Sequence, residues 1–77
     1  MGGIEPEQQI AQAVVAYRST TGMTVEQLSE ATGIPRADII RLEEGTADPT
    51  LSTLKRLAAG MGMALKLEFV PISPTGQ

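Results

Sequence analysis

Four short stretches of apolar residues at helical spacing, each ended by glycine, constrain the fold of this chain more than any other feature. The apolar residues recur at steps of three and four, which is the period of a helix that buries one face. Glycine ends helices because it adopts the left-handed C-cap conformation without a Cβ clash. The pattern predicts a bundle of short helices. The glycines expected at their ends are Gly22, Gly33, Gly45, Gly60 and Gly62.

The first two expected helices have clear local signals. The first covers residues 6–20, and Pro6 suits its first turn. Its predicted inward stripe is Ile10, Val14 and Tyr17. The second begins at Thr24, whose hydroxyl can accept from the Gln27 amide while the Gln27 side chain reaches back, as in a capping box. Its predicted inward residues are Leu28 and Ala31.

The next two expected helices follow tight turns. Gly33 ends the second helix, and Pro35 starts a third that covers residues 35–44. Its predicted inward residues are Ile39 and Leu42, with Ile34 just before it. Thr50 is a good N-cap for the fourth helix. Its predicted stripe is Leu51, Leu54, Leu57 and Ala58.

The apolar period then changes from about 3.6 to two, which predicts a half-buried strand. Its buried face is Leu65, Leu67 and Phe69, and its solvated face carries Lys66 and Glu68. A lone strand leaves amides and carbonyls unpaired, so we expect it to pair with the same strand of a second copy in an antiparallel ribbon. The expected organisation is a flexible N-terminus (1–5), a helical domain (6–62), a dimerisation strand (63–70) and a disordered tail (71–77).

The composition excludes several function classes. The chain has no cysteine and no histidine, which removes zinc fingers, thiol nucleophiles, disulfides and the usual general base. We therefore expect no enzyme, metal or cofactor. The apolar runs are too short for a membrane span, and the first residues lack the features of a signal peptide, so we expect a cytoplasmic protein. The net charge of −3 is unfavourable for nucleic-acid binding, which usually relies on a basic excess, and it predicts weak binding by a lone monomer.

The second and third expected helices, joined by the Gly33 turn and braced on each side, form a helix-turn-helix, whose second helix enters the DNA major groove. The chain resembles the Xre family of phage-repressor-like regulators over most of its length. The residues that carry the resemblance are Gly22-Met23-Thr24, Leu28, Thr32-Gly33-Ile34, Ile39, Leu42-Glu43-Glu44-Gly45, Asp48-Pro49-Thr50-Leu51, Thr53-Leu54 and Leu57-Ala58. The ending, residues 62–71, is similar to HigA-type antitoxins. The resemblance implies an all-α, four-helix domain with one C-terminal β-strand paired across a dimer.

The resemblance also implies a repressor that binds an inverted-repeat operator in double-stranded DNA as a homodimer. The antitoxin-like ending implies control of its own operon and a basic toxin as partner. The family also has an interhelical ion pair at the positions of Arg18 and Glu43. Arg36 can make bidentate bonds to guanine, and Thr50 can bring a helix N-terminus to phosphate. The expected DNA-binding residues are Thr24, Val25, Pro35, Arg36, Ala37, Asp38, Ile40, Arg41, Thr50, Lys55 and Arg56.

A second hypothesis is an interaction module that kept the fold but lost DNA binding. The family often has glutamine where Val25 stands, and an acidic group such as Glu44 would repel phosphate. Ile40 fits either a thymine methyl or a protein partner. Glu26 and Glu30 have no pocket or partner in the sequence pattern, so we expect a solvated helix face there. The departures that favour the module are Val25, Asp38, Ile40, Glu44 and the net charge of −3.

Overall fold

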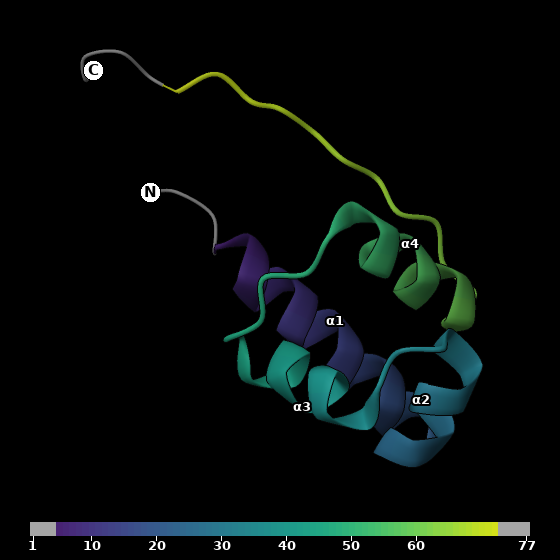
Figure 1. Ribbon diagram of the computed structural model, residues 1–77. Coiled ribbons are helices and arrows are strands. Elements are labelled where there is room, and N and C mark those ends of the chain that lie inside the picture. Colours follow the sequence, from purple (N-terminus) through teal and green to yellow (C-terminus); the bar gives the residue numbers. More distant parts are fainter. Residues whose placement is uncertain (1–4, 73–77) are drawn as a thin grey trace.

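Four helices make up the body of the computed structural model, which describes residues 5–72 (Figure 1). The helices are α1, Pro6–Thr21; α2, Val25–Thr32; α3, Arg36–Glu44; and α4, Leu51–Gly60. Helix α1 packs on α3, and α2 packs on both α3 and α4. The predicted all-α fold is confirmed. Residues 1–4 and 73–77 lie outside the described residues, and with them most of the expected flexible N-terminus and disordered tail.

The core is aliphatic and joins all four helices. Val14 of α1, Leu28 of α2 and Ile39 of α3 are fully enclosed. The other buried members of the cluster are Ile34, Leu42, Leu57 and Met61. Tyr17 only packs against its edge, so the described residues form a core without a buried aromatic ring. The helices therefore depend on close packing of aliphatic side chains.

Two residues predicted to face inward are exposed, namely Ala31 and Leu51. On α2 the buried position is Thr32, four residues after Leu28, and its hydroxyl donates to the Leu28 carbonyl at 2.8 Å. This bond satisfies the hydroxyl, so a polar residue can occupy the inward face. Leu51 is half exposed because it begins α4, at the end opposite the contact that Gly60 makes with α2.

Gly33 makes the turn between α2 and α3. Its φ of +73° lies in the left-handed region, and its amide donates to the Ser29 carbonyl at 2.9 Å. The Ser29 hydroxyl donates to the Ile34 carbonyl at 2.6 Å, and the Ile34 amide donates to the Thr32 hydroxyl at 3.2 Å. These bonds fix the direction in which α3 leaves the turn.

Gly60 ends α4, as expected, but it also allows α4 to approach α2 closely. A Cβ at Gly60 would lie 2.5 Å from Cγ2 of Thr32 and 2.9 Å from the carbonyl oxygen of Ala31. Any larger residue would therefore push the two helices apart.

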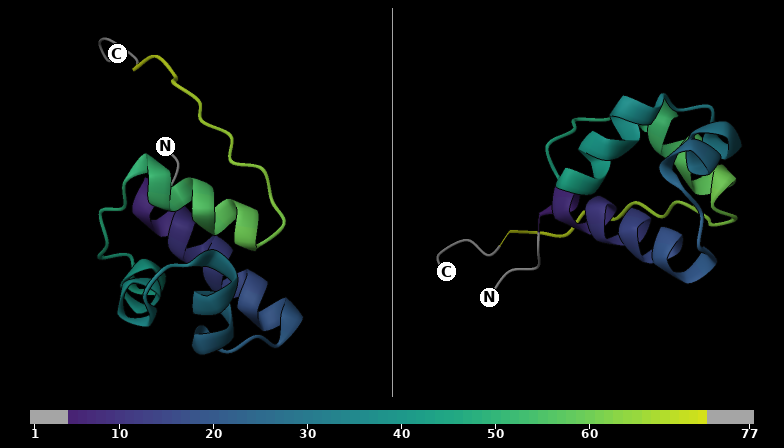
Figure 2. Two further views of the ribbon diagram at one scale, coloured as in Figure 1. Left: turned by 45° about the vertical axis from the view of Figure 1, so that its right-hand side comes forward. Right: turned by 90° about the horizontal axis from the view of Figure 1, so that it is seen from below.

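After α4 the chain leaves the helical body as an extended segment (Figures 1 and 2). Residues 63–72 of the single chain are assigned neither helix nor strand. Leu67 is 64% exposed and Phe69 is 100% exposed. A strand needs a neighbour to pair with, so the C-terminal strand and its pairing in a dimer stay predictions. Among the described helices, none has the length and apolar content needed to span a membrane.

Candidate nucleic-acid interface

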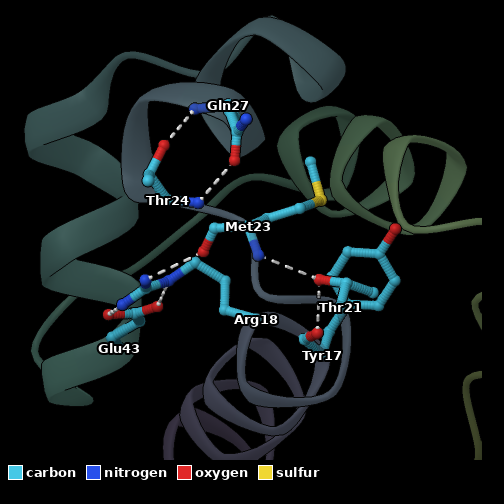
Figure 3. A network of polar contacts seen from close by, with 7 residues as sticks. All are labelled: Tyr17, Arg18, Thr21, Met23, Thr24, Gln27 and Glu43. Atoms are coloured by element: carbon cyan, nitrogen blue, oxygen red, sulfur yellow. Dashed lines mark hydrogen bonds and ion pairs between the residues drawn. The ribbon is translucent and has the colours of Figure 1, made fainter.

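An ion pair holds the C-terminal end of α3 on α1 (Figure 3). Nε of Arg18 lies 2.6 Å from Oε2 of Glu43, and Nη2 of Arg18 donates to Oε1 at 2.9 Å. Nη1 of Arg18 also donates to the carbonyl of Met23, just before α2, at 3.2 Å. The hydrogen bond to Glu43 raises the pKa of Arg18 above its ordinary value. The family resemblance implied this pair, and here it braces α1, α3 and the residues before α2 against one another.

The capping box predicted at the start of α2 is confirmed (Figure 3). The Gln27 amide donates to the Thr24 hydroxyl at 3.0 Å, and the Thr24 amide donates to Oε1 of Gln27 at 2.9 Å. Thr24 is exposed and Val25 is half-buried. The start of α2 is thus held at the surface, where a helix N-terminus can receive an anion.

Glu26 already brings a negative charge to this helix end. A hydrogen bond from its own backbone N–H, and next its bond from Arg36, lower the pKa of the Glu26 carboxyl. A carboxylate that stays charged there competes with any phosphate that approaches the same N-terminus.

The outer face of α3 is exposed but its arginines are paired. Nε of Arg36 lies 2.7 Å from Oε2 of Glu26, and Nη2 of Arg41 forms an ion pair with Oδ1 of Asp38. The Arg36 and Glu26 side chains are more than half exposed, so the strength of their pair is low. Pro35 and Ala37, on either side of Arg36, are exposed, whereas Asp38 and Ile40 are half-buried. Ile40 is therefore only partly open to solvent and to either of the two partners considered for it.

The N-terminus of α4 lies beside α3. The Thr50 hydroxyl accepts from the Thr53 amide at 3.1 Å, which confirms the predicted N-cap. Asp38, Arg41 and Thr50 line one hollow between α3 and α4, so the fold brings these predicted site residues together. Lys55 and Arg56 are exposed further along α4, and Nη1 of Arg56 donates to the Gly33 carbonyl at 3.5 Å.

Neither ion pair on this face was predicted from the sequence. Asp38 and Arg41 stand three residues apart on one helix, and that spacing of opposite charges is a signal that could have found them. Glu26 and Arg36 stand ten residues apart on different helices. No local spacing rule predicts their contact, because it depends on the angle set by the Gly33 turn.

A family model described as "Helix-turn-helix" matches residues 16–66, which include α2, the Gly33 turn, α3 and α4. The chain belongs to the helix-turn-helix family. The match confirms the membership that the resemblance to Xre-type regulators predicted.

Two individual proteins are similar to this helix-turn-helix chain. One is an uncharacterized HTH-type transcriptional regulator of Methanothermobacter thermautotrophicus, 39% identical over 46 residues, which are 60% of this chain and 67% of the relative. The other is a solved structure named "MDT Protein", with a TM-score of 0.70 and 24% identity, covering 92% of this chain and 100% of that one. The second likeness supports the fold alone.

Proposed function

We propose that this helix-turn-helix protein is a DNA-binding transcriptional regulator that represses from an inverted-repeat operator as a homodimer in the cytoplasm. The observation that carries the proposal is the exposed face of α3, with Arg36, Ala37 and Arg41, on a helix braced by the Arg18–Glu43 pair. A braced helix can enter the major groove in one fixed orientation. The family match and the regulator among its relatives support the same assignment.

The dimer is needed because the charge of one chain is unfavourable. At −3 the monomer gains little from counterion release, the main source of non-specific affinity. A two-fold dimer would present two copies of α3 about 34 Å apart to one face of a duplex. The second half-site then binds within the same complex, which multiplies affinity without further contacts.

Fluorescence anisotropy against a salt series tests the proposal. The probes are a duplex from the DNA upstream of the gene and a scrambled duplex of the same length. Arg36→Ala should weaken specific binding by about 1 to 3 kcal/mol and relax the preference at one base pair of each half-site, if Arg36 reads guanine. Arg56→Ala should weaken binding to both probes alike and flatten the salt dependence, if Arg56 holds only phosphate.

Equal and very weak binding of both duplexes at low salt, by protein shown to be folded and dimeric, would contradict the regulator. Equal losses in both variants on both probes would contradict the separate roles of Arg36 and Arg56.

The narrower proposal is an antitoxin that controls its own operon and binds a basic toxin. It rests on the similarity of residues 62–71 to HigA-type antitoxins and on the acidic total charge, which suits a basic partner. The test is to examine whether the neighbouring reading frame encodes a small basic protein, and then to co-express that protein with this chain and measure whether the two co-purify. A neighbour that is neither small nor basic, or that fails to co-purify, would remove the antitoxin role and leave the regulator intact.

The second candidate function is an interaction module without DNA binding. The observation that favours it is the pairing of both α3 arginines with carboxylates, Arg36 with Glu26 and Arg41 with Asp38. On that reading the acidic surface binds a basic protein, and the anisotropy experiment gives no specific binding. Specific binding of the upstream duplex would exclude this module.

A further inference from the structure

The C-terminal segment exposes several large apolar side chains in succession. Phe69 is 100% exposed, Val70 72% and Ile72 89%. Exposed apolar residues in one continuous run mark a surface that binds a partner. The backbone of these residues is extended and pairs with no neighbouring strand. A partner strand could therefore cover their side chains and also satisfy their amides and carbonyls.

The C-terminal segment begins beside an apolar groove between α1 and α4. The groove is lined by Ile10 and Ala13 of α1, by Leu54 and Leu57 of α4, and by residues 63–66. Leu65 lines the groove together with its neighbours Ala64 and Lys66, and it is 38% exposed. Side chains alternate along an extended chain, so in a strand Leu67 and Phe69 would share the face of Leu65.

We propose that a second copy of the chain pairs with residues 64–70 as an antiparallel strand, in the register that places Leu67 opposite the partner's Leu67. This inference rests on the proposed dimer and specifies its interface. In this register Leu65 lies opposite the partner's Phe69, and Ala64 lies opposite the partner's Val70. The solvated face then places Lys66 opposite the partner's Glu68, twice in each dimer by symmetry.

Charge and apolar pattern together select this register. If the two-fold axis moves by one residue, Lys66 meets the partner's Lys66, or Glu68 meets the partner's Glu68. Like charges directly opposite are destabilising, whereas opposite charges and apolar pairs stabilise a strand pair. If the axis falls between two residues, Lys66 or Glu68 lies opposite a leucine on the apolar face.

The register also closes the groove. Directly opposite side chains of an antiparallel pair lie on the same face, close enough to touch. The partner's Phe69 would therefore lie beside Leu65 at the groove and cover its apolar wall, and the symmetric contact would do the same in the other copy. Each copy completes the apolar surface that the other leaves open.

A charge exchange tests the register by sedimentation equilibrium of the full chain at low ionic strength. Lys66→Glu alone sets a carboxylate against the partner's Glu68, and Glu68→Lys alone sets two lysines together. Each should weaken the dimer about tenfold, since two cross-strand pairs change from attraction to repulsion. The double variant Lys66→Glu/Glu68→Lys restores opposite charges in this register, and the dimer should recover to within about threefold of the wild type.

Cysteine cross-linking gives an independent measurement, because the chain has no cysteine of its own. Leu67→Cys should form a covalent dimer under mild oxidation, since the introduced thiol faces its own copy across the axis. Leu65→Cys is the matched control, and its two thiols would lie four positions apart along the ribbon, beyond the Cα separation of about 7 Å that a disulfide can bridge. Circular dichroism checks that both variants keep their helices.

A wild-type chain that stays monomeric at micromolar concentration would overturn both the dimer and the register. A wild-type dimer whose double variant fails to recover, or whose Leu65→Cys variant cross-links as readily as Leu67→Cys, would overturn the register alone. Neither measurement uses DNA, so the anisotropy experiment judges the regulator separately.

Discussion

Gly60→Ala should destabilise the protein, although alanine is normally the better helix residue. The new Cβ would lie 2.5 Å from Cγ2 of Thr32 and 2.9 Å from the carbonyl oxygen of Ala31. Thr32 cannot turn away at low cost, because its hydroxyl is bonded to the Leu28 carbonyl and to the Ile34 amide. The oxygen of Ala31 belongs to the backbone of α2, so α4 must shift.

The magnitude follows from two opposing effects. Overpacking costs about 1 to 3 kcal/mol, and a contact with backbone places this substitution in the upper part of that range. Alanine returns about 0.5 to 1 kcal/mol of helix propensity at most. We therefore expect a net loss of about 1 to 2 kcal/mol in the free energy of unfolding.

Urea unfolding followed by circular dichroism measures this loss. The matched control is Ala59→Gly, the reverse change at the neighbouring exposed position, which should cost only the propensity difference of about 0.5 to 1 kcal/mol. Adding Thr32→Ser to Gly60→Ala removes the closer of the two clashing atoms and should recover part of the stability. A Gly60→Ala variant as stable as the wild type would refute the close approach of α4 to α2.

Two further substitutions test the surface that supports the site. Glu43→Gln leaves the partly buried Arg18 without its counter-charge and should lower the free energy of unfolding in urea by about 1 to 3 kcal/mol. The control is Glu44→Gln at the exposed neighbouring position, which should cost little. Equal losses in the two variants would contradict the stabilising role of the Arg18–Glu43 pair. Arg36→Ala should raise the pKa of the Glu26 carboxyl, which NMR of its carboxyl carbon can follow, and an unchanged pKa would contradict the Arg36 contact. Because the folded pKa of Glu26 is lowered, its contribution to stability is present above the unfolded pKa and is lost as the pH falls through the folded pKa.

The sequence predicted the helices because each has its own start and stop signals. Thr24 and Gln27 form their capping box within one turn, and Gly33 closes the helix that they start. Such contacts involve residues that are neighbours along the chain, and their spacing alone specifies them. Element boundaries and the helix-turn-helix could therefore be predicted without knowledge of the tertiary structure.

Features that depend on the angle between helices could not be predicted in this way. The choice of Thr32 rather than Ala31 as the inward residue of α2 depends on where α4 lies. Ala31 is three residues and Thr32 four residues after the buried Leu28, and both spacings fit one face of a two-turn helix. The contact of Arg36 with Glu26 depends on the direction of α3 after its turn. The partner proposed for the C-terminal segment is a second copy of the chain, so the alternation of residues indicates a strand but does not by itself give its pairing.

The net negative charge relates the proposed DNA-binding face of α3 to the proposed dimer interface at the C-terminal segment. The ion pair of Arg36 with Glu26 is exposed and therefore weak, so a phosphate can displace the carboxylate, but that carboxylate then stays near the DNA and repels it. In the proposed dimer the affinity comes from two half-sites, and thus depends on the proposed C-terminal interface. Lys66→Glu and Glu68→Lys change the net charge in opposite directions. Both should nevertheless weaken binding of the upstream duplex at protein concentrations near the dimer Kd. The double variant should restore binding of that duplex. Stronger DNA binding by Glu68→Lys would show that net charge, rather than dimerisation, limits the affinity.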